Sequence, residues 1–516
     1  MKKDTGTSTA LESTEVGSEQ PPMLSVGQQA TRGVLWLTAQ KWAARIFSFV
    51  TIIILTRLLS PEDFGTVAAA STVLPFFYLL SDLGFAAYIV QVDKTDRRML
   101  STAFWFSMSA GIVLCAVLFA LAPLLGGLFG DADVIPVMQV LSLWVIATAV
   151  GSVPLAIMRR DMRFAAIAGQ ATIAALAAQV VAIAMAFSGF GVWALVGQSL
   201  TAPVISTILL WISARWRPGL GFSRPDFVRM VSFGSQVLGV EFVAMLRASG
   251  EAAVISSSLG LAKFGYMNIA QRLVQMVQDL TGGAIVPVTQ VAFAKIRNDV
   301  GRLRAAYVRA LRLTYAALSL PLTFVAVASP LIVPIVFGPG WEQSFAVAQI
   351  LALAGSLSIG AWLDHGLFYG VGKPGRWFMY AIVIDALTLG TTIALVSSGL
   401  VAVAWGFLAV CLVATMVRWF LTSRLLDTHW YSVAGPFCYL VVVTVIAGAA
   451  GWGMMLLTSD LPPVLSILAI GVAVTLTHLG VTRLVARTVI DEGVRILAHS
   501  RWGRRMPILR HRGSTT

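Results

Sequence analysis

Charged side chains lie inside long apolar stretches of this sequence, where a charge is costly. A charge at the centre of a bilayer costs at least about 2.5–3.5 kcal/mol, so such groups face protein or water rather than lipid. Cations there can hold an anion such as phosphate, and carboxylates can carry a proton or a sodium ion. The set comprises Lys41, Arg45, Arg247, Arg272, Asp82, Glu241, Glu251, Asp279, Asp364 and Asp385.

Helical spacing puts some of these charges on common faces. Lys41 and Arg45 are four residues apart, as are Arg247 and Glu251, and residues four apart share a helix face. Two adjacent cations cannot neutralise each other, so Lys41 and Arg45 are predicted to bind an anionic group. Arg247 and Glu251 are predicted either to form a structural ion pair or to belong to a ligand site.

A polar stripe surrounds Arg272, which lies seven residues before Asp279 on the same helical face. Three glutamines accompany them, namely Gln271, Gln275 and Gln278. Such a stripe cannot face lipid. Arg272, Gln271 and Gln275 are therefore candidate ligand-binding residues, and an Arg272–Asp279 ion pair is the structural alternative.

The acidic residues offer a second chemistry. Glu241, Asp279, Asp364 and Asp385 are candidates for coupling transport to an ion, with structural pairing as the alternative. Asp82 lies near the inner end of its apolar stretch and is expected to be solvated. A lone histidine, His478, is expected to be a hydrogen-bonded packing residue.

The composition excludes an ordinary soluble enzyme. Of 516 residues, 57% are hydrophobic and 12% charged, whereas soluble proteins carry roughly 25% charged residues. The three cysteines lie in apolar runs without metal-ligand spacing, and there is no nucleotide-binding or nucleophile motif. The sequence therefore predicts a membrane protein without catalytic residues, metal or cofactor.

The elements that position these charges are predicted to be about fourteen membrane-spanning helices, each near 20 apolar residues. Two of them, 264–293 and 305–337, are long enough to contain breaks. The predicted spans are 34–56, 64–90, 101–125, 134–158, 164–187, 190–213, 229–254, 264–293, 305–337, 344–370, 376–397, 400–423, 434–457 and 463–485.

The basic residues indicate the orientation of these spans. On the predicted topology, 31 of the 37 lysines and arginines lie on the side of the termini, 2 lie opposite and 4 lie within spans. Basic loops stay in the cytoplasm, so both termini are predicted to be cytoplasmic. The net charge of +13 then reflects orientation and gives no reason to expect nucleic acid.

An internal repeat divides the chain. Residues 41–70 align without a gap on 241–270, matching Phe64 with Phe264 and Gly65 with Gly265, and Phe129-Gly130 resembles Phe337-Gly338. Six spans per copy give two lobes of the same orientation around an axis along the membrane normal. The prediction is an all-α polytopic protein with these parts: a tail 1–33, lobes 34–213 and 229–425, an interfacial connection 214–228, two appended helices in 434–485 and a basic tail 486–516.

Several segments resemble Wzx-type polysaccharide flippases of the multidrug/oligosaccharidyl-lipid/polysaccharide (MOP) superfamily. They are Thr56-Arg57-Leu58-Leu59-Ser60-Pro61-Glu62-Asp63-Phe64-Gly65, Arg159-Arg160-Asp161-Met162-Arg163-Phe164, Gly189-Phe190-Gly191-Val192-Trp193-Ala194-Leu195, Phe264-Gly265-Tyr266-Met267-Asn268-Ile269-Ala270, Val336-Phe337-Gly338-Pro339-Gly340-Trp341 and Gly370-Val371-Gly372-Lys373. The similarity covers about residues 30–425.

The resemblance implies alternating-access export of an undecaprenyl-pyrophosphate-linked oligosaccharide across a bacterial inner membrane, for exopolysaccharide, capsule or O-antigen. It also implies proximity to polysaccharide polymerase and export machinery. Lys41, Arg45, Arg247 and Arg272 would then hold the headgroup. Three alternatives stay open: a multidrug/cation antiporter of the same superfamily, an integral-membrane glycosyltransferase or polymerase, and a non-transporting membrane scaffold.

Overall fold

The structure, a computed structural model, describes residues 47–92, 95–161, 163–282 and 285–486 of the chain. These residues form helices joined by short connections and contain no strand, which confirms the all-α prediction. The predicted tails 1–33 and 486–516 lie outside the described residues, apart from Ala486.

The first lobe contains a helix at Phe47–Leu58 followed by α2 to α9. Their bounds are α2 Pro61–Thr72, α3 Leu74–Asp82, α4 Phe85–Gln91, α5 Arg97–Phe129, α6 Val134–Leu141, α7 Leu143–Arg160, α8 Phe164–Phe187 and α9 Val192–Ala214. The capping box at the start of α2 is complete, since Ser60 Oγ accepts from the Asp63 amide and Asp63 accepts from the Ser60 amide.

The second lobe and the appended helices follow. Their bounds are α10 Arg224–Leu259, α11 Leu261–Gly282, α12 Ile285–Lys295, α13 Val300–Phe337, α14 Gln343–Gly370, α15 Pro374–Leu395, α16 Leu400–Leu425, α17 Trp430–Leu457 and α18 Pro463–Val485. A short 3-10 turn, Val396–Ser398, joins α15 to α16.

Within the described residues, 11 helical segments are long and apolar enough to cross a membrane, so the protein is a multi-pass membrane protein. The predicted count of fourteen is not confirmed. The three remaining predicted spans correspond to Phe47–Leu58, of which only 12 residues are described, to α10 and to α11. Helices α10 and α11 carry the charges described above, which lower their hydropathy.

The predicted breaks fall partly in other places. The span 64–90 is interrupted at Val73 and again at Leu83 and Gly84, whose φ angles of 45° and 72° lie in the left-handed region. In the long stretch 264–293, α11 ends at Gly282 and α12 begins at Ile285, and the two residues between them lie outside the described residues. The other long stretch, 305–337, is one continuous helix despite three internal prolines.

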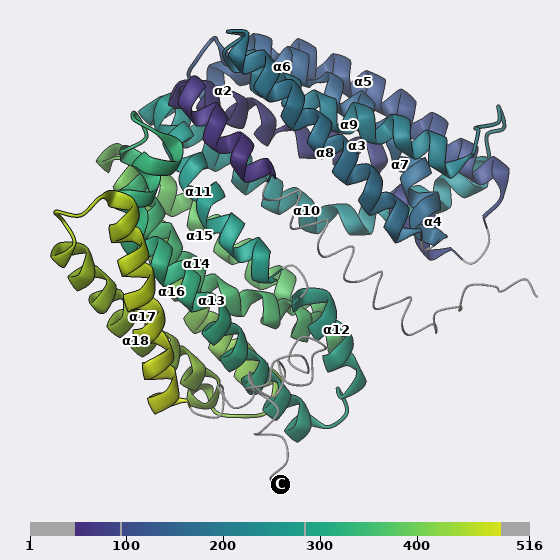
Figure 1. Cartoon of the computed structure of the whole chain (residues 1–516). Helices are drawn as coiled ribbons and strands as arrows, with labels where there is room; N and C mark the ends of the chain where they lie inside the picture. The colour runs from purple at the N-terminus through teal and green to yellow at the C-terminus, as the bar shows by residue number, and fades with distance from the viewer. Residues whose placement is uncertain (1–46, 93–94, 162, 283–284, 487–516) are drawn as a thin grey trace, which may run out of the picture.

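The two lobes meet near the N-terminal ends of α2 and α11 and diverge away from that junction (Figure 1). Helix α10 contacts both lobes. Its Met230 packs with Phe85 and Phe104 of the first lobe, while its Arg247 pairs with Asp385 of α15.

The contacts at the junction obey the predicted repeat. A β-carbon on Gly65 would lie 1.9 Å from the Leu261 carbonyl oxygen, and one on Gly265 would lie 1.9 Å from the Pro61 carbonyl oxygen. Pro61 and Leu261 are equivalent in the repeat, 200 positions apart, as are Gly65 and Gly265, so the two glycines make the same contact in opposite directions. This reciprocity is the signature of a two-fold contact and confirms the two parallel lobes.

A second pair of contacts repeats the pattern. Gly130 and Gly338 end α5 and α13 with φ angles of 78° and 91°. A β-carbon on Gly130 would approach Ser257 Cα at 2.8 Å, and one on Gly338 would approach Arg57 Cγ at 3.3 Å. Arg57 and Ser257 are themselves equivalent in the repeat.

The connection predicted over 214–228 is shorter than expected, because residues 224–228 belong to α10. Its remaining residues are bonded to α5: the Trp105 indole donates to the Gly219 carbonyl at 2.8 Å, and the Ser223 amide donates to Thr102 Oγ1 at 2.8 Å. This segment is therefore part of the first lobe's packing.

The appended helices α17 and α18 pack along α13 on the flank of the second lobe (Figure 1). His478 of α18 lies 2.9 Å from Ser319 Oγ of α13 and is buried, as expected for a hydrogen-bonded packing residue. Tyr439 of α17 and Thr482 of α18 share a further buried hydrogen bond.

Candidate functional site at the junction of the lobes

Arg272 extends from α11 into the region between the lobes. Its Nε donates to Asn268 Oδ1 at 2.9 Å, one helical turn earlier. No described group accepts a hydrogen bond from its two terminal nitrogens, and it pairs with no carboxylate among the described side chains. Among the described side chains, Arg272 therefore has no counter-charge, and it presents a forked cation.

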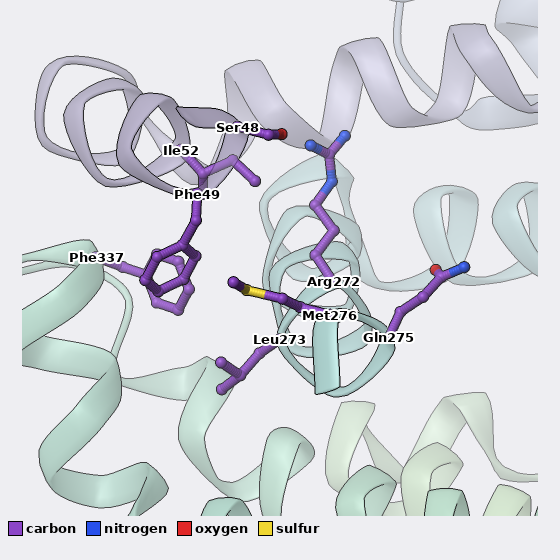
Figure 2. A pocket seen from close by; sticks show the side chains of 8 residues that line it. All are labelled: Ser48, Phe49, Ile52, Arg272, Leu273, Gln275, Met276 and Phe337. Carbon is purple, nitrogen blue, oxygen red and sulfur yellow. The ribbon is translucent and has the colours of Figure 1, made fainter. Parts of the chain in front are cut away.

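A cavity of about 240 Å³ lies on one side of Arg272, between the helix Phe47–Leu58 and α11. In Figure 2, the side chains of Phe49 and Phe337 lie together on one wall and Met276 points toward them, whereas Gln275 points to the opposite side. Ser48, Phe49, Ile52, Arg272, Leu273, Gln275, Met276 and Phe337 line the cavity. Apart from Arg272, Gln275 and Ser48, this lining is apolar.

A second cavity of about 200 Å³ also touches Arg272 and has a different lining. It lies between α2 and α9 of the first lobe and α11 of the second. Its polar lining residues are Ser71, Thr72, Gln198, Ser199, Asn268 and Arg272. Arg272 is thus shared by one mainly apolar cavity and one mainly polar cavity.

The glutamines of the predicted stripe line a third cavity of about 220 Å³, between α11 and the helices α14 and α16. Gln271, Gln275 and Gln278 all belong to it, and the Gln278 amide donates to the Gly355 carbonyl at 3.3 Å. The polar face of α11 is therefore turned toward cavities between helices.

Arg247 has two carboxylate partners. Its Nη1 lies 2.7 Å from Glu251 Oε2, and its Nε lies 2.8 Å from Asp385 Oδ1. Of the two alternatives predicted for Arg247 and Glu251, the structure contains the ion pair. The pair with Asp385, which joins α10 to α15, was not predicted because Asp385 lies far away in the sequence.

Asp364 lies in a buried network that links α13, α14 and α16. Arg418 Nη1 lies 3.3 Å from its Oδ2, while the hydroxyls of Tyr307 and Thr422 donate to its Oδ1 at 2.5 and 3.0 Å. Arg418 Nη2 also donates to the Leu357 carbonyl at 2.9 Å.

Two sequence interpretations need correction. The 31 basic residues that the predicted topology places on the cytoplasmic side include Arg418, but this residue lies inside α16 with 3% of its surface exposed. Asp82 was expected to be solvated, but it is 8% exposed and its Oδ1 has no described partner. A left-handed turn at Leu83 and Gly84 separates α3 from α4, and Phe85 of α4 is itself buried.

The remaining predicted residues cannot be placed with their side chains. Lys41 and Arg45 lie outside the described residues, as do the side chains of Glu241 and Asp279, whose backbone belongs to α10 and α11. The proposed roles of these four residues therefore stay predictions.

The polar cavity was missed at the level of sequence. Its first-lobe residues, Ser71, Thr72, Gln198 and Ser199, are small or neutral side chains inside apolar helices, and nothing in the sequence connects positions so far apart. Asn268 carried a weak signal, because it stands one helical turn before Arg272.

The chain matches a family described as polysaccharide biosynthesis protein over residues 54–346. It is 26% identical to the succinoglycan biosynthesis transport protein ExoT of Rhizobium meliloti over 75% of this chain and 76% of that protein. It is 25% identical to the lipopolysaccharide biosynthesis protein WzxC of Escherichia coli over 78% and 82%.

Solved structures share the fold. The lipid II flippase MurJ in an inward closed conformation superposes with a TM-score of 0.71 at 14% identity, covering 88% of this chain and 100% of MurJ. An inward-facing MATE multidrug transporter of the MOP superfamily gives 0.62 at 16% identity, covering 74% and 94%. The family match spans more than half of the 516 residues, and the chain belongs to the polysaccharide biosynthesis protein family.

Proposed function

We propose that the protein is a flippase that moves undecaprenyl-pyrophosphate-linked oligosaccharide repeat units across the bacterial inner membrane for surface polysaccharide synthesis. Its family and the names of its relatives, one a transport protein for succinoglycan, support this proposal. Such a lipid carries a pyrophosphate and a glycan that cannot cross hydrocarbon unaided, and a tail that need not leave it.

The observation that carries the proposal is the exposed guanidinium of Arg272 at the junction of the lobes, which has no carboxylate partner among the described side chains. A membrane protein does not keep a cation without a counter-charge unless water or a ligand offsets its desolvation. A phosphate group matches the forked geometry of the two free terminal nitrogens. Lys41 and Arg45 join Arg272 in the proposed headgroup site.

Arg247 receives a different role in this proposal. Glu251 and Asp385 already offset its charge, so it is not free to hold the headgroup. Instead, Arg247 joins α10 to α15, and the cluster of Arg247, Glu251 and Asp385 is where we place the search for ion coupling. Asp364 is bonded to Arg418, Tyr307 and Thr422, which favours a structural role for this carboxylate.

Transport would proceed by rocking of the two lobes. They touch where α2 and α11 begin and diverge toward the other side (Figure 1), which on the predicted orientation is the cytoplasm. The cavities at Arg272 would then load from the inner leaflet. The protein would change no covalent bond, and a polymerase or export complex would consume the lipid-linked product.

The cation antiporter is the competing transporter. Such a protein needs carboxylates in its ligand cavity to attract a cation, yet the described residues lining the three cavities around α11 include none. The one charged group among them is Arg272, which would repel a cationic drug.

The decisive experiment deletes the gene and measures the leaflet distribution of lipid-linked glycan. We expect accumulation in the inner leaflet and loss of surface polysaccharide, restored by the wild-type gene and not by Arg272→Gln or the double variant Lys41→Gln/Arg45→Gln. Arg304→Gln, an exposed arginine on α13 away from the cavities, is the control. Unchanged surface polysaccharide in the deletion strain would contradict the flippase proposal.

A further inference from the structure

The polar cavity beside Arg272 has a composition that a phosphate site alone does not require. Besides Arg272, its polar lining consists of three hydroxyl and two amide side chains and includes no described carboxylate; these side chains are Ser71, Thr72, Ser199, Gln198 and Asn268. A phosphate needs donors and positive charge, whereas these five groups are neutral and several offer acceptors.

Two of the three hydroxyl groups are available to a ligand as acceptors. Thr72 Oγ1 donates its proton to the Ala68 carbonyl at 2.7 Å, and Ser199 Oγ donates to the Leu195 carbonyl at 2.9 Å. A hydroxyl group has one proton and two lone pairs. With the proton used inside the helix, each oxygen is left to receive a hydrogen bond from a ligand.

The amides supply both kinds of group. Gln198 Nε2 donates to Gln179 Oε1 at 2.7 Å, which leaves its own oxygen and one N–H. Asn268 Oδ1 accepts from Arg272, which leaves the two hydrogens of its nitrogen. The cavity therefore combines acceptors with donors at fixed positions, the arrangement that binds hydroxyl groups, since each hydroxyl both donates and accepts.

We infer that this cavity is a sugar subsite, which holds the sugar attached directly to the pyrophosphate. The inference rests on the flippase proposal and adds to it an order along the ligand: isoprenoid in the apolar cavity by Phe49, phosphate at Arg272, first sugar among Gln198, Ser199 and Asn268. Because α2 and α9 belong to one lobe and α11 to the other, this sugar contacts both lobes.

The test measures binding to the purified full-length protein in nanodiscs. The probes are undecaprenyl pyrophosphate and its glucosyl and galactosyl derivatives. We expect at least one glycosylated lipid to bind more tightly than the bare lipid. Gln198→Leu should weaken binding of that lipid about fivefold, the effect of about one hydrogen bond, and change binding of the bare lipid less than about twofold. Arg272→Gln should weaken all three.

Gln179→Leu is the matched control. It removes the same Gln179–Gln198 hydrogen bond but leaves the cavity lining unchanged, so the affinities for the bare and the glycosylated lipids should stay near wild type. Ser199→Ala tests the same wall if Gln198→Leu does not fold. Equal wild-type affinity for all three lipids, or equal losses for bare and glycosylated lipids in Gln198→Leu, overturns the sugar subsite while the flippase proposal stands. Failure of the wild type to bind any of the three overturns the flippase proposal, and the subsite with it.

Discussion

Arg418 and Asp364 form an ion pair at 3.3 Å in which each residue is only 3% exposed. The pair joins α14 to α16, and Tyr307 adds a hydrogen bond from α13. Removing two charges from water costs free energy. The ion pair and its additional hydrogen bonds offset that cost only while both charged partners are present.

Removing one partner of this pair should therefore strongly destabilise the folded protein. We expect Arg418→Met to lower the free energy of unfolding by about 3–5 kcal/mol, because it leaves a buried carboxylate without a counter-charge. The double variant Arg418→Met/Asp364→Asn should recover part of that loss. Thermal unfolding in detergent checks both.

The control for this pair lies on the same helix. Arg424 is exposed and stacks over Phe420 at 4.2 Å, so Arg424→Met should cost about 0.5–1 kcal/mol. Equal unfolding temperatures for Arg418→Met and Arg424→Met would contradict the structural role of the buried pair.

Arg247 bridges two carboxylates, so removing Arg247 should destabilise the protein more than removing either carboxylate. We expect Arg247→Gln to destabilise the protein by about 2 kcal/mol or more, because Glu251 and Asp385 both lose a charged donor. Glu251→Gln and Asp385→Asn each leave Arg247 one carboxylate and should be milder. Unfolding midpoints rank the three; a larger effect of Asp385→Asn than of Arg247→Gln would refute the bridging role.

The glycine contact between the lobes predicts a conformational phenotype. In Gly65→Ala or Gly265→Ala, the new methyl group cannot fit 1.9 Å from a carbonyl oxygen, so the lobes must part where α2 and α11 begin. In a cysteine-free background, we expect faster labelling of Ser71→Cys by an impermeant thiol reagent added on that side.

Gly453→Ala is the control for this measurement, because nothing lies within 4 Å of a β-carbon at that position of α17. It should leave labelling unchanged. Labelling of Ser71→Cys at the wild-type rate in both junction variants, with normal protein levels, would show that the contact does not close that side.

Trp341 forms another part of the closed side. Its indole donates to the Thr56 carbonyl at 2.9 Å, and its ring packs edge-on against Phe64 at 5.3 Å. Trp341→Phe keeps the ring contact and loses the hydrogen bond. Such a bond is worth about 1 kcal/mol, so the fraction of molecules open on this side should rise about fivefold. The same labelling assay measures this rise, and Trp452→Phe, at an exposed tryptophan of α17, should show none.

Much of the fold follows from the sequence because hydrophobic length and repeat spacing are local signals. The alignment of Gly65 with Gly265 predicted two equivalent lobes, and the positions of the basic residues in the loops predicted the orientation of the spans. The sequence did not show that these glycines touch, since a contact between repeats depends on how the two lobes dock.

The misplaced residues share one cause. Arg418 stands near the end of an apolar stretch, where an arginine usually marks a loop, and its burial depends on Asp364, 54 residues earlier. Trp341 follows a predicted span, where a tryptophan typically anchors the helix at the membrane interface, but its surroundings come from both lobes and leave it 1% exposed. In each case the deciding partner is distant in the chain.

The approach of Gly65 to Leu261 and of Gly265 to Pro61 is made by main-chain atoms, so it carries no information about what is transported. The walls around Arg272, in contrast, consist of side chains. We infer that cargo selection and the mechanics of closure are encoded in separate sets of positions. Evolution can then exchange one glycan for another by changing the residues around Arg272 while the contact between the two glycines stays the same.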